Sequence, residues 1–246
     1  MKAYSMLLDM LAASALLASA SDHTPALSAV PNLNDDLKHI VLRELWERTE
    51  LSTRDRSLVS AAAVVAQGHT RALSFQFALA LDSGVTPQEL AGTVAHLMYY
   101  SGISAALGAE SALADVFAQR GVELSSLRVT GAQAEPDQAA AQAQREIVLS
   151  MVGDVSPGLA HFSNTALNGD LWLRDDLAPR DRSLVTISAL ITQGNVEQLP
   201  VHISKGMDNG LKRSEIGEVI TQLAFYAGWP RAFSAATTVK AMELYE

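Results

Sequence analysis

The chain has 246 residues, of which 48% are hydrophobic and 18% charged, so it can bury a sizeable core. The 18 Lys and Arg residues against 27 Asp and Glu give a formal net charge of −9, which disfavours binding to nucleic acid or to anionic lipid headgroups. The sequence contains no cysteine, which excludes disulfides, thiol catalysis and thiolate metal sites. Its histidines are scattered without an HExxH spacing, so no metal site is predicted either.

Residues 1–33 are predicted to form an N-terminal extension. Lys2 precedes an apolar, alanine-rich run that ends in Ala18-Ser19-Ala20, which is the outline of a secretory signal with an A-x-A cleavage site. Asp9 interrupts the apolar run and favours an amphipathic first helix instead. We therefore expect either a periplasmic or secreted protein, or a cytoplasmic one that retains this segment. No later stretch approaches the ~20 apolar residues of a membrane span.

The most informative feature is an internal repeat. Residues 54–59, Arg-Asp-Arg-Ser-Leu-Val, recur as residues 180–185, an offset of 126 from Asp55 to Asp181. The same offset continues without a gap and pairs Trp46 with Trp172, Gln67-Gly68 with Gln193-Gly194, Glu89 with Glu215, and Tyr100 and Gly102 with Tyr226 and Gly228. We interpret the chain as a tandem duplication, with units at residues 34–130 and 131–246.

Both units are predicted to be helical. Apolar runs end at Gly68 and Gly194, residues that favour a helix C-terminus because glycine tolerates left-handed backbone angles. The next helices are expected at residues 69–82 and 195–208. Thr86-Pro87-Gln88-Glu89 combines an N-cap, a proline in the first turn and a capping-box glutamate.

Ser214 and Glu215 are expected to open the helix that corresponds to the one after Thr86. A polar linker is predicted at about residues 121–137, and a helical arm at residues 139–151 is predicted to lead into the second unit. No segment shows sustained alternation of apolar and polar residues, which would be typical of a strand. The sequence therefore predicts an all-α fold of two similar helical bundles.

A candidate functional segment lies in the second unit, at residues 194–202. If residues 195–202 form one helix, Asn195, Gln198 and His202 share a face. A single histidine on a helix is more often a hydrogen-bonded structural residue than a catalyst. His202 corresponds to Gln76 in the first unit, so folding does not require a histidine at both copies of this position. This difference between the units makes His202 a candidate for function.

The second unit resembles the carboxymuconolactone decarboxylase family, which shares a superfamily with the AhpD-type alkylhydroperoxidases. The resemblance covers residues 144–246 and, more weakly, residues 35–120. It is carried by Gly169-Asp170-Leu171-Trp172, Arg182-Ser183-Leu184, Gly194 to His202 with Glu197, Asn209-Gly210, Glu215-Ile216, Tyr226-Ala227-Gly228-Trp229-Pro230 and Ser234-Ala235. It implies an AhpD-like helical fold and a homo-oligomer, in which three tandem chains form a ring of six units.

The resemblance also implies a reaction in which a carboxylated muconolactone loses carbon dioxide without a cofactor. The peroxidase branch has two cysteines and a histidine on the helix face discussed above, and a glutamate nearby. This chain has Asn195, Gln198 and His202 at those positions and Ser183 in place of the glutamate, which excludes a thiol peroxidase. Trp229 and Arg231 replace smaller residues of the family, so the substrate can differ from the family's own.

Decarboxylation of this kind needs a cation for the leaving carboxylate, a general acid and apolar walls. His202 is the predicted general acid, because the unperturbed pKa of histidine is about 6.5. Arg182 is a candidate for the cation, although its copy Arg56 occurs in the unit without that histidine, which favours a structural role. Glu197 lies on another face of the expected helix, so it acts from a neighbouring unit or is a solvated charge.

Six further residues are predicted to contact the substrate: Trp172, Asn195, Gln198, Tyr226, Trp229 and His96. The combined expectation is a lyase that uses neither cofactor nor metal and acts on a small carboxylated lactone or a related carbonyl compound. Two alternatives remain open. One is a cofactor-free isomerase, cyclase or hydrolase that uses the same acid, and the other is a non-catalytic helical binding protein.

Overall fold

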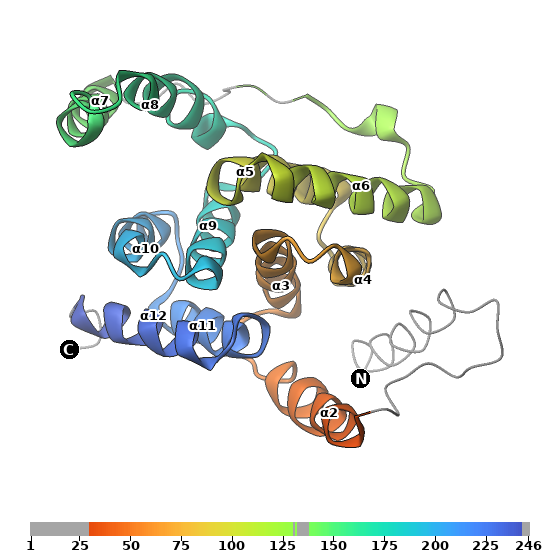
Figure 1. Ribbon diagram of the computed structural model, residues 1–246. Helices are drawn as coiled ribbons and strands as arrows, with labels where there is room; N and C mark the ends of the chain where they lie inside the picture. Colours follow the sequence, from red (N-terminus) through yellow and green to blue (C-terminus); the bar gives the residue numbers. More distant parts are fainter. Residues whose placement is uncertain (1–29, 130, 132–137, 243–246) are drawn as a thin grey trace.

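The computed structural model describes residues 30–129, 131 and 138–242 (Figure 1). The signal-like run and Asp9 lie outside the described residues. Within these residues every regular element is a helix, which confirms the predicted all-α fold. None of the described helices is both long enough and apolar enough to cross a membrane.

The two halves contain corresponding series of helices. The first half consists of α2 (Pro31–Asp36), the π-helix η2 (Leu37–Leu45), α3 (Thr53–Gln67), α4 (Thr70–Asp82), α5 (Pro87–Ser101) and α6 (Ile103–Arg120). The second half consists of α8 (Pro157–Phe162), the π-helix η4 (Ser163–Leu167), the 3-10 turn η5 (Leu171–Leu173), α9 (Pro179–Gln193), the 3-10 turn η6 (Val196–Gln198), α10 (Leu199–Asp208), α11 (Arg213–Ala227) and α12 (Trp229–Ala241). Between the halves lie a 3-10 turn, η3 (Leu124–Ser126), and α7 (Gln138–Val152), which covers the predicted helical arm.

Local sequence accounts for most helix ends. Gly68 and Gly194 end α3 and α9 with φ angles of 68° and 81°, which only glycine adopts without strain. Both halves of the predicted capping box form at α5, where the backbone N–H of Glu89 binds Thr86 Oγ1 at 3.2 Å and the Thr86 N–H binds the Glu89 carboxylate at 2.7 Å.

The start of α11 differs from the prediction by two residues. The N-cap is Lys212 rather than Ser214, and its backbone N–H donates to the Glu215 carboxylate at 2.7 Å. A lysine side chain cannot accept a hydrogen bond, so only the glutamate half of the capping box contributes here. Glu215 therefore sets the start of this helix without the help of a serine cap.

Helices α3 and α9 form the centre of the molecule and pack against each other (Figure 1). Helix α5 of the first half packs on both of them, and so does α11 of the second half. Helices α4 and α6 complete the first half, while α10 and α12 complete the second. One hydrophobic core contains residues of both halves, so the two units interleave and are not separate bundles.

The repeated Arg-Asp-Arg motif connects the two central helices. Arg54 on α3 binds Asp181 on α9 at 2.7 Å, and Arg180 on α9 binds Asp55 on α3 at 2.8 Å. Each arginine also binds a glutamate in the first turn of another helix of its own half. Arg54 binds Glu89 on α5, and Arg180 binds Glu215 on α11. Each copy of the motif supplies one half of a reciprocal contact, which explains why both units contain it.

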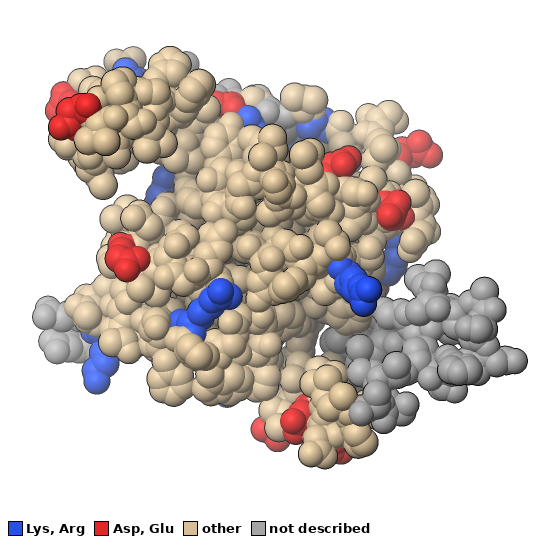
Figure 2. Space-filling model, viewed as in Figure 1, with Lys and Arg blue, Asp and Glu red and all other residues tan. Residues whose placement is uncertain are grey.

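Helix α7 lies at the edge of the molecule and has no buried residues (Figure 1). It contacts α8 and η4. On the face shown in Figure 2, acidic and basic side chains are scattered among larger areas of other residues, and no extended patch of one sign is visible. This distribution gives no sign of a polyanion-binding surface on that face.

Candidate active site

His202 is a half-buried residue of α10 that faces aromatic side chains from both halves. The centroid of its ring lies 5.5 Å from that of Tyr100 on α5 and 6.1 Å from that of Trp172 in η5. Trp172 donates its indole N–H to the Tyr100 hydroxyl at 2.9 Å. Lys205, one turn after His202, places its Nζ 3.4 Å from the Trp172 ring centroid. We call these four residues the His202 cluster.

A buried network supports Tyr100 from behind. His96 on α5 is fully buried and stacks on the Tyr100 ring at 4.8 Å. The Thr186 hydroxyl donates to the Arg182 carbonyl at 2.9 Å, so its oxygen accepts the N–H of His96 Nε2 at 2.7 Å. His96 Nδ1 then accepts from the Arg182 guanidinium at 3.4 Å. The ring is neutral, and burial followed by the charge of Arg182 lowers the pKa of His96 well below its usual value.

Arg182 is also fully buried, and its guanidinium is already bonded. It donates to the Asp176 carboxylate at 2.6 Å and to the Arg174 carbonyl at 3.0 Å, in addition to its contact with His96. Gly92 makes room for Asp176, because a Cβ atom there would lie 3.0 Å from that side chain. This geometry supports the structural interpretation of Arg182 rather than the carboxylate clamp.

Burial sets the ionisation of the cluster. It lowers the pKa of His202 to about 4, with a further contribution from the charge of Lys205. Burial and the positive charge of Arg182 lower the pKa of Lys205 to about 8. Burial also raises the pKa of Tyr100 to about 12. At pH 7, before an anion binds, His202 and Tyr100 are therefore neutral while most Lys205 side chains are protonated. The general-acid role of His202 was predicted from the unperturbed histidine pKa of about 6.5, whereas its pKa in this environment is about 4.

The cluster contains two groups without a polar partner in the described parts of the chain. His202 Nδ1 is buried and makes no hydrogen bond there. Lys205 forms no ion pair with a described carboxylate, and its ammonium contacts the face of an indole instead. A buried polar atom without a partner costs about 1–3 kcal/mol, so this arrangement favours a ligand that supplies one. An anionic group with hydrogen-bonding oxygen atoms would satisfy both residues.

Four of the predicted site residues come together here: His202, Arg182, Trp172 and His96. Tyr226 and Trp229 do not join them. They line a different cavity, which also contains Trp46. The tyrosine beside His202 is Tyr100, because α5 of the first half, and not α11 of the second, contributes to this part of the molecule.

The segment before α10 also differs from the prediction of one helix over residues 195–208. Asn195 has non-helical angles (φ −81°, ψ 57°), and a separate 3-10 turn follows before α10 begins at Leu199. Pro200 lies in the first turn of α10, where its missing N–H is tolerated, and it is a signal for this start. Asn195, Glu197 and Gln198 are exposed and lie before α10 begins, whereas His202 lies within α10.

Two residues of the cluster were not identified from the sequence. Lys205 lies three residues after His202, so helical spacing alone places it on nearly the same face. Tyr100 was recognised only as the copy of Tyr226. No group of three or more His, Asp or Glu side chains in the described ranges is arranged to hold a metal ion.

Two segments of the chain, residues 31–115 and 157–241, match the Carboxymuconolactone decarboxylase family. The chain belongs to this family. The two matches also confirm the tandem arrangement of family units inferred from the repeat. Their positions within the chain differ by the offset that separates Asp55 from Asp181.

Two curated proteins are similar to parts of this carboxymuconolactone decarboxylase family member. The 4-carboxymuconolactone decarboxylase of Acinetobacter baylyi is 31% identical over 87 residues, which are 35% of this chain and 65% of the relative. The nitrosuccinic acid decarboxylase npaB of Metarhizium robertsii is 33% identical over 67 residues, which are 27% of this chain and 47% of the relative. The similarity thus spans less than two thirds of the length of either relative.

Proposed function

We propose that this protein is a cofactor-independent carboxy-lyase that acts on a small carboxylated lactone or a related carbonyl compound at the His202 cluster. The observation that carries the proposal is the buried, unpartnered His202 Nδ1 beside the ammonium of Lys205. A substrate carboxylate would pair with Lys205 and accept or share a proton with His202. The names of both relatives denote the removal of a carboxyl group from an acid, which supports the reaction class.

Substrate binding changes the ionisation of His202. The negative charge of a carboxylate next to His202 raises its pKa from about 4, because the charged imidazolium gains a partner of opposite sign. The protonated fraction of His202 therefore increases as the substrate binds. Lys205 holds the carboxylate against the indole of Trp172, where burial strengthens the ion pair.

The chemical step then needs only the substrate and this proton. The bond between the carboxylate carbon and the adjacent carbon breaks, and carbon dioxide leaves. The electron pair of that bond passes into the neighbouring carbonyl to give an enolate. His202 delivers its proton to the carbon α to that carbonyl, and the carbonyl is restored. The rings of Trp172 and Tyr100 exclude water and favour the transition state, in which charge is more dispersed than in the carboxylate.

The proposed assembly is a homo-oligomer of tandem chains, with a trimer as the expected state. Glu197 lies exposed on η6 and is available to a neighbouring chain in such an assembly. Light scattering on the full chain measures the mass directly. A monomer in solution would leave Glu197 without a role in the reaction.

The decisive experiment incubates the protein with gamma-carboxymuconolactone and other carboxylated carbonyl compounds and follows carbon dioxide. The wild-type protein is expected to release it, and His202→Gln to lose at least about a hundredfold in rate. Glutamine is a fair replacement, because the chain itself places Gln76 at the corresponding position. Exchange of Gln76 for leucine in the other half is the matched control and should leave the rate unchanged.

Conversion of these compounds without release of carbon dioxide would contradict the proposal and favour an isomerase, cyclase or hydrolase. Full decarboxylation by His202→Gln would remove His202 from the mechanism. Either result is separable from a folding defect, since the helical circular dichroism signal and the melting temperature report on the fold of each variant.

A further inference from the structure

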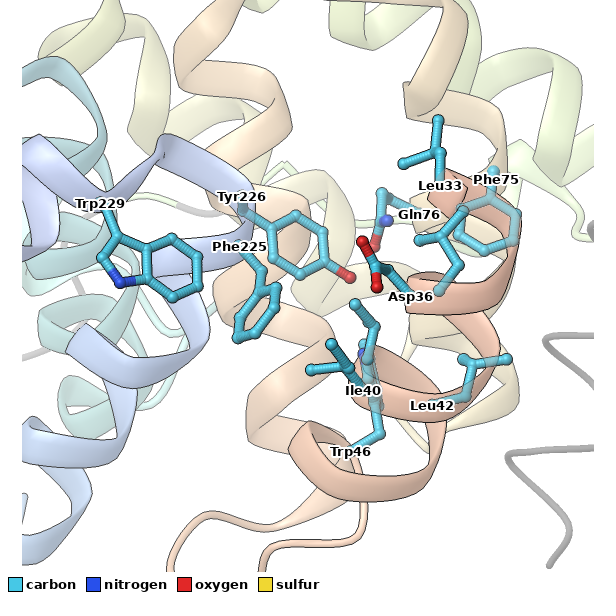
Figure 3. Close-up of a pocket in the computed structure, with 12 residues that line it drawn as sticks. Leu33, Asp36, Ile40, Leu42, Trp46, Phe75, Gln76, Phe225, Tyr226 and Trp229 are labelled. Carbon is cyan, nitrogen blue, oxygen red and sulfur yellow. The ribbon is translucent and has the colours of Figure 1, made fainter. Parts of the chain in front are cut away.

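A cavity of about 520 Å³ in the first half shows which elements enclose the position that corresponds to His202 (Figure 3). Its wall includes Trp46 and Gln76, which the offset of the repeat pairs with Trp172 and His202. Helices α2 and η2 supply one group of lining residues, and α4, α11 and α12 supply another. The volume falls within the roughly 300–1,000 Å³ of small-molecule sites.

The second half contains the same wall elements. Helix α8 begins and ends at the offset of the repeat from α2, and a π-helix follows each of them directly, η2 in the first half and η4 in the second. Pro31 and Pro157 lie in the first turns of α2 and α8. The π-helix η4 contacts η5, the turn that contains Trp172 of the His202 cluster. Helices α8 and η4 thus adjoin this cluster along the chain and in space.

A recess separates α8 from the body of the molecule. Helix α8 packs mainly on α7 and η4, and Figure 1 places α7 and α8 apart from α10. Figure 2, in the same view, shows the surface hollowed between these two helices and the region of α10. Helix α10 carries His202 and Lys205. The hollow is open on the face shown, as the entrance to a binding site must be.

Large apolar side chains are exposed at positions that correspond to the cavity wall. The five residues are Tyr99, Ile103, Leu159, Phe162 and Val201. They are between 37% and 70% exposed, and each is the copy of a residue that lines the cavity of the first half. They come from α5, α6, α8 and α10, so the pattern of no single helix explains the set. Exposed apolar side chains that gather near a few polar groups are typical of a ligand site.

Charge distinguishes the two walls. Asp36 lines the cavity of the first half, whereas the corresponding residue of the second half is Phe162. Leu79 corresponds to Lys205. None of the described residues that line the cavity of the first half is a lysine, arginine or histidine. The second half therefore has one negative charge fewer and one positive charge more at these positions, which favours an anionic ligand there.

We propose that α8 and η4 form the outer wall of the substrate pocket of the His202 cluster, and that this wall selects a carboxylate attached to an apolar body the size of a ring. Lys205 binds the carboxylate, while Phe162 and Val201 contact the apolar body. The inference rests on the proposed function for the place of the carboxylate and adds residues that determine specificity. Replacement of Phe162 should therefore change the affinity for the apolar body and leave the binding of a small carboxylate unchanged.

Titration with three matched compounds that undergo no decarboxylation tests this wall. Cyclohexaneacetate and acetate lack a second carbonyl group that could take up the electron pair, and cyclohexaneacetamide lacks the carboxylate. Nuclear magnetic resonance signals of the His202 imidazole carbons at pH 7, identified by their absence in His202→Gln, report binding at this site. Cyclohexaneacetate is expected to bind at least about tenfold more tightly than acetate, because its ring leaves water. It should exceed the neutral amide by a similar factor, because only the acid pairs with Lys205.

Variants of Phe162 locate the apolar body. Phe162→Ser should weaken the binding of cyclohexaneacetate at least about threefold and leave that of acetate unchanged. Phe162→Leu keeps an apolar side chain and should restore most of the affinity. Phe233→Ser is the matched control, because Phe233 is 66% exposed, like Phe162 at 64%, and lies one turn after Trp229 of the other cavity. Lys205→Met should weaken the binding of both acids.

Two results would overturn the proposal. One is equal binding of cyclohexaneacetate and acetate to the wild-type protein, and the other is unchanged binding of cyclohexaneacetate in Phe162→Ser. The outcome is separable from that of the proposed reaction. Binding that depends on Phe162 and Lys205, without release of carbon dioxide from any compound, would support the wall and refute the reaction. Release of carbon dioxide with no effect of Phe162→Ser on binding would support the reaction and refute the wall.

Discussion

Burial lowers the pKa of His202, and its neighbour Lys205 adds to this effect. Burial and this ammonium together lower the pKa of His202 to about 4, so the histidine is neutral at pH 7 until an anion arrives. His202 was identified from its difference from Gln76, whereas its protonation state depends on how deeply the fold buries it. The identity of the residue was therefore readable from the sequence, and its chemistry was not.

Replacement of the lysine tests this coupling. In Lys205→Met the pKa of His202 is expected to rise from about 4 toward, but not to, about 6.5, because burial remains when the positive charge is gone. Nuclear magnetic resonance titration of the imidazole carbons measures it. Exchange of Lys240, an exposed lysine of α12, is the control and should leave the titration of His202 unchanged. An unchanged pKa in Lys205→Met would exclude the coupling.

The rate should also depend on the charge of Lys205. Its pKa of about 8 means that kcat/KM falls as the pH rises through this value, since the deprotonated amine no longer attracts the carboxylate. Lys205→Arg keeps a positive charge at all accessible pH values and is expected to abolish this alkaline decline. Persistence of the same decline in Lys205→Arg would assign it to another group.

At the scale of elements, Gly92 lets α5 approach the segment before α9. The absence of a side chain at Gly92 leaves space for Asp176. Asp176 accepts a hydrogen bond from Arg182, and Arg182 also contacts His96, which lies on α5 like Gly92. The corresponding position in α11 is Glu218, which binds Arg56 directly. The carboxylate partner of the buried arginine thus comes from a different element in each half. The repeat aligned Gly92 with Glu218 but could not show this exchange, because Asp176 reaches its arginine only through tertiary packing.

A methyl group at Gly92 is expected to displace Asp176. Gly92→Ala should lower the free energy of unfolding by about 1–3 kcal/mol, because the crowding outweighs the better helix propensity of alanine. Gly108→Ala is the matched control, since its added Cβ would lie 3.4 Å from Thr70 Cγ2 and α6 would gain helix propensity. Urea unfolding followed by circular dichroism measures both variants. A Gly92→Ala protein as stable as Gly108→Ala would show that Asp176 moves aside without cost.

The whole molecule is held together by contacts that cross between the halves. Glu218 on α11 accepts from Arg56 on α3 at 2.8 Å and from Arg48 at 2.7 Å, and it is only 3% exposed. Neutralising this carboxylate leaves Arg56 buried without a countercharge. The pair is therefore more sensitive to loss of one partner than an ion pair at the surface.

Glu218→Gln is expected to lower the free energy of unfolding by about 3–5 kcal/mol. The control is Asp82→Asn. It breaks an ion pair in which Arg120, 41% exposed, donates two hydrogen bonds of 2.7 Å to the Asp82 carboxylate. This replacement should lower the free energy of unfolding by at most about 1 kcal/mol. Chemical denaturation compares the two variants. Similar losses would show that burial does not amplify the cross-half pair.

At this scale the sequence predicted more about the fold than about the site. The helices, their glycine ends and the duplication follow from local residues and from the repeat, and they are confirmed. The composition of the His202 cluster does not follow, because Tyr100 and Tyr226 are equivalent in the repeat and only packing decides which one lies beside His202. Trp229 was likewise assigned to this cluster but lines the other cavity.

The interleaving of the halves also determines how the two sites can change. When two separate, identical subunits form a pair, every amino-acid replacement is present twice, so both sites gain or lose a histidine together. Within one covalent chain each copy is encoded separately. The reciprocal ion pairs of Arg54 and Arg180 connect the two halves in the same way, although the residues at positions 76 and 202 differ. One polypeptide can therefore carry unlike residues at the two equivalent positions, and a replacement at one position leaves the residue at the other unaltered.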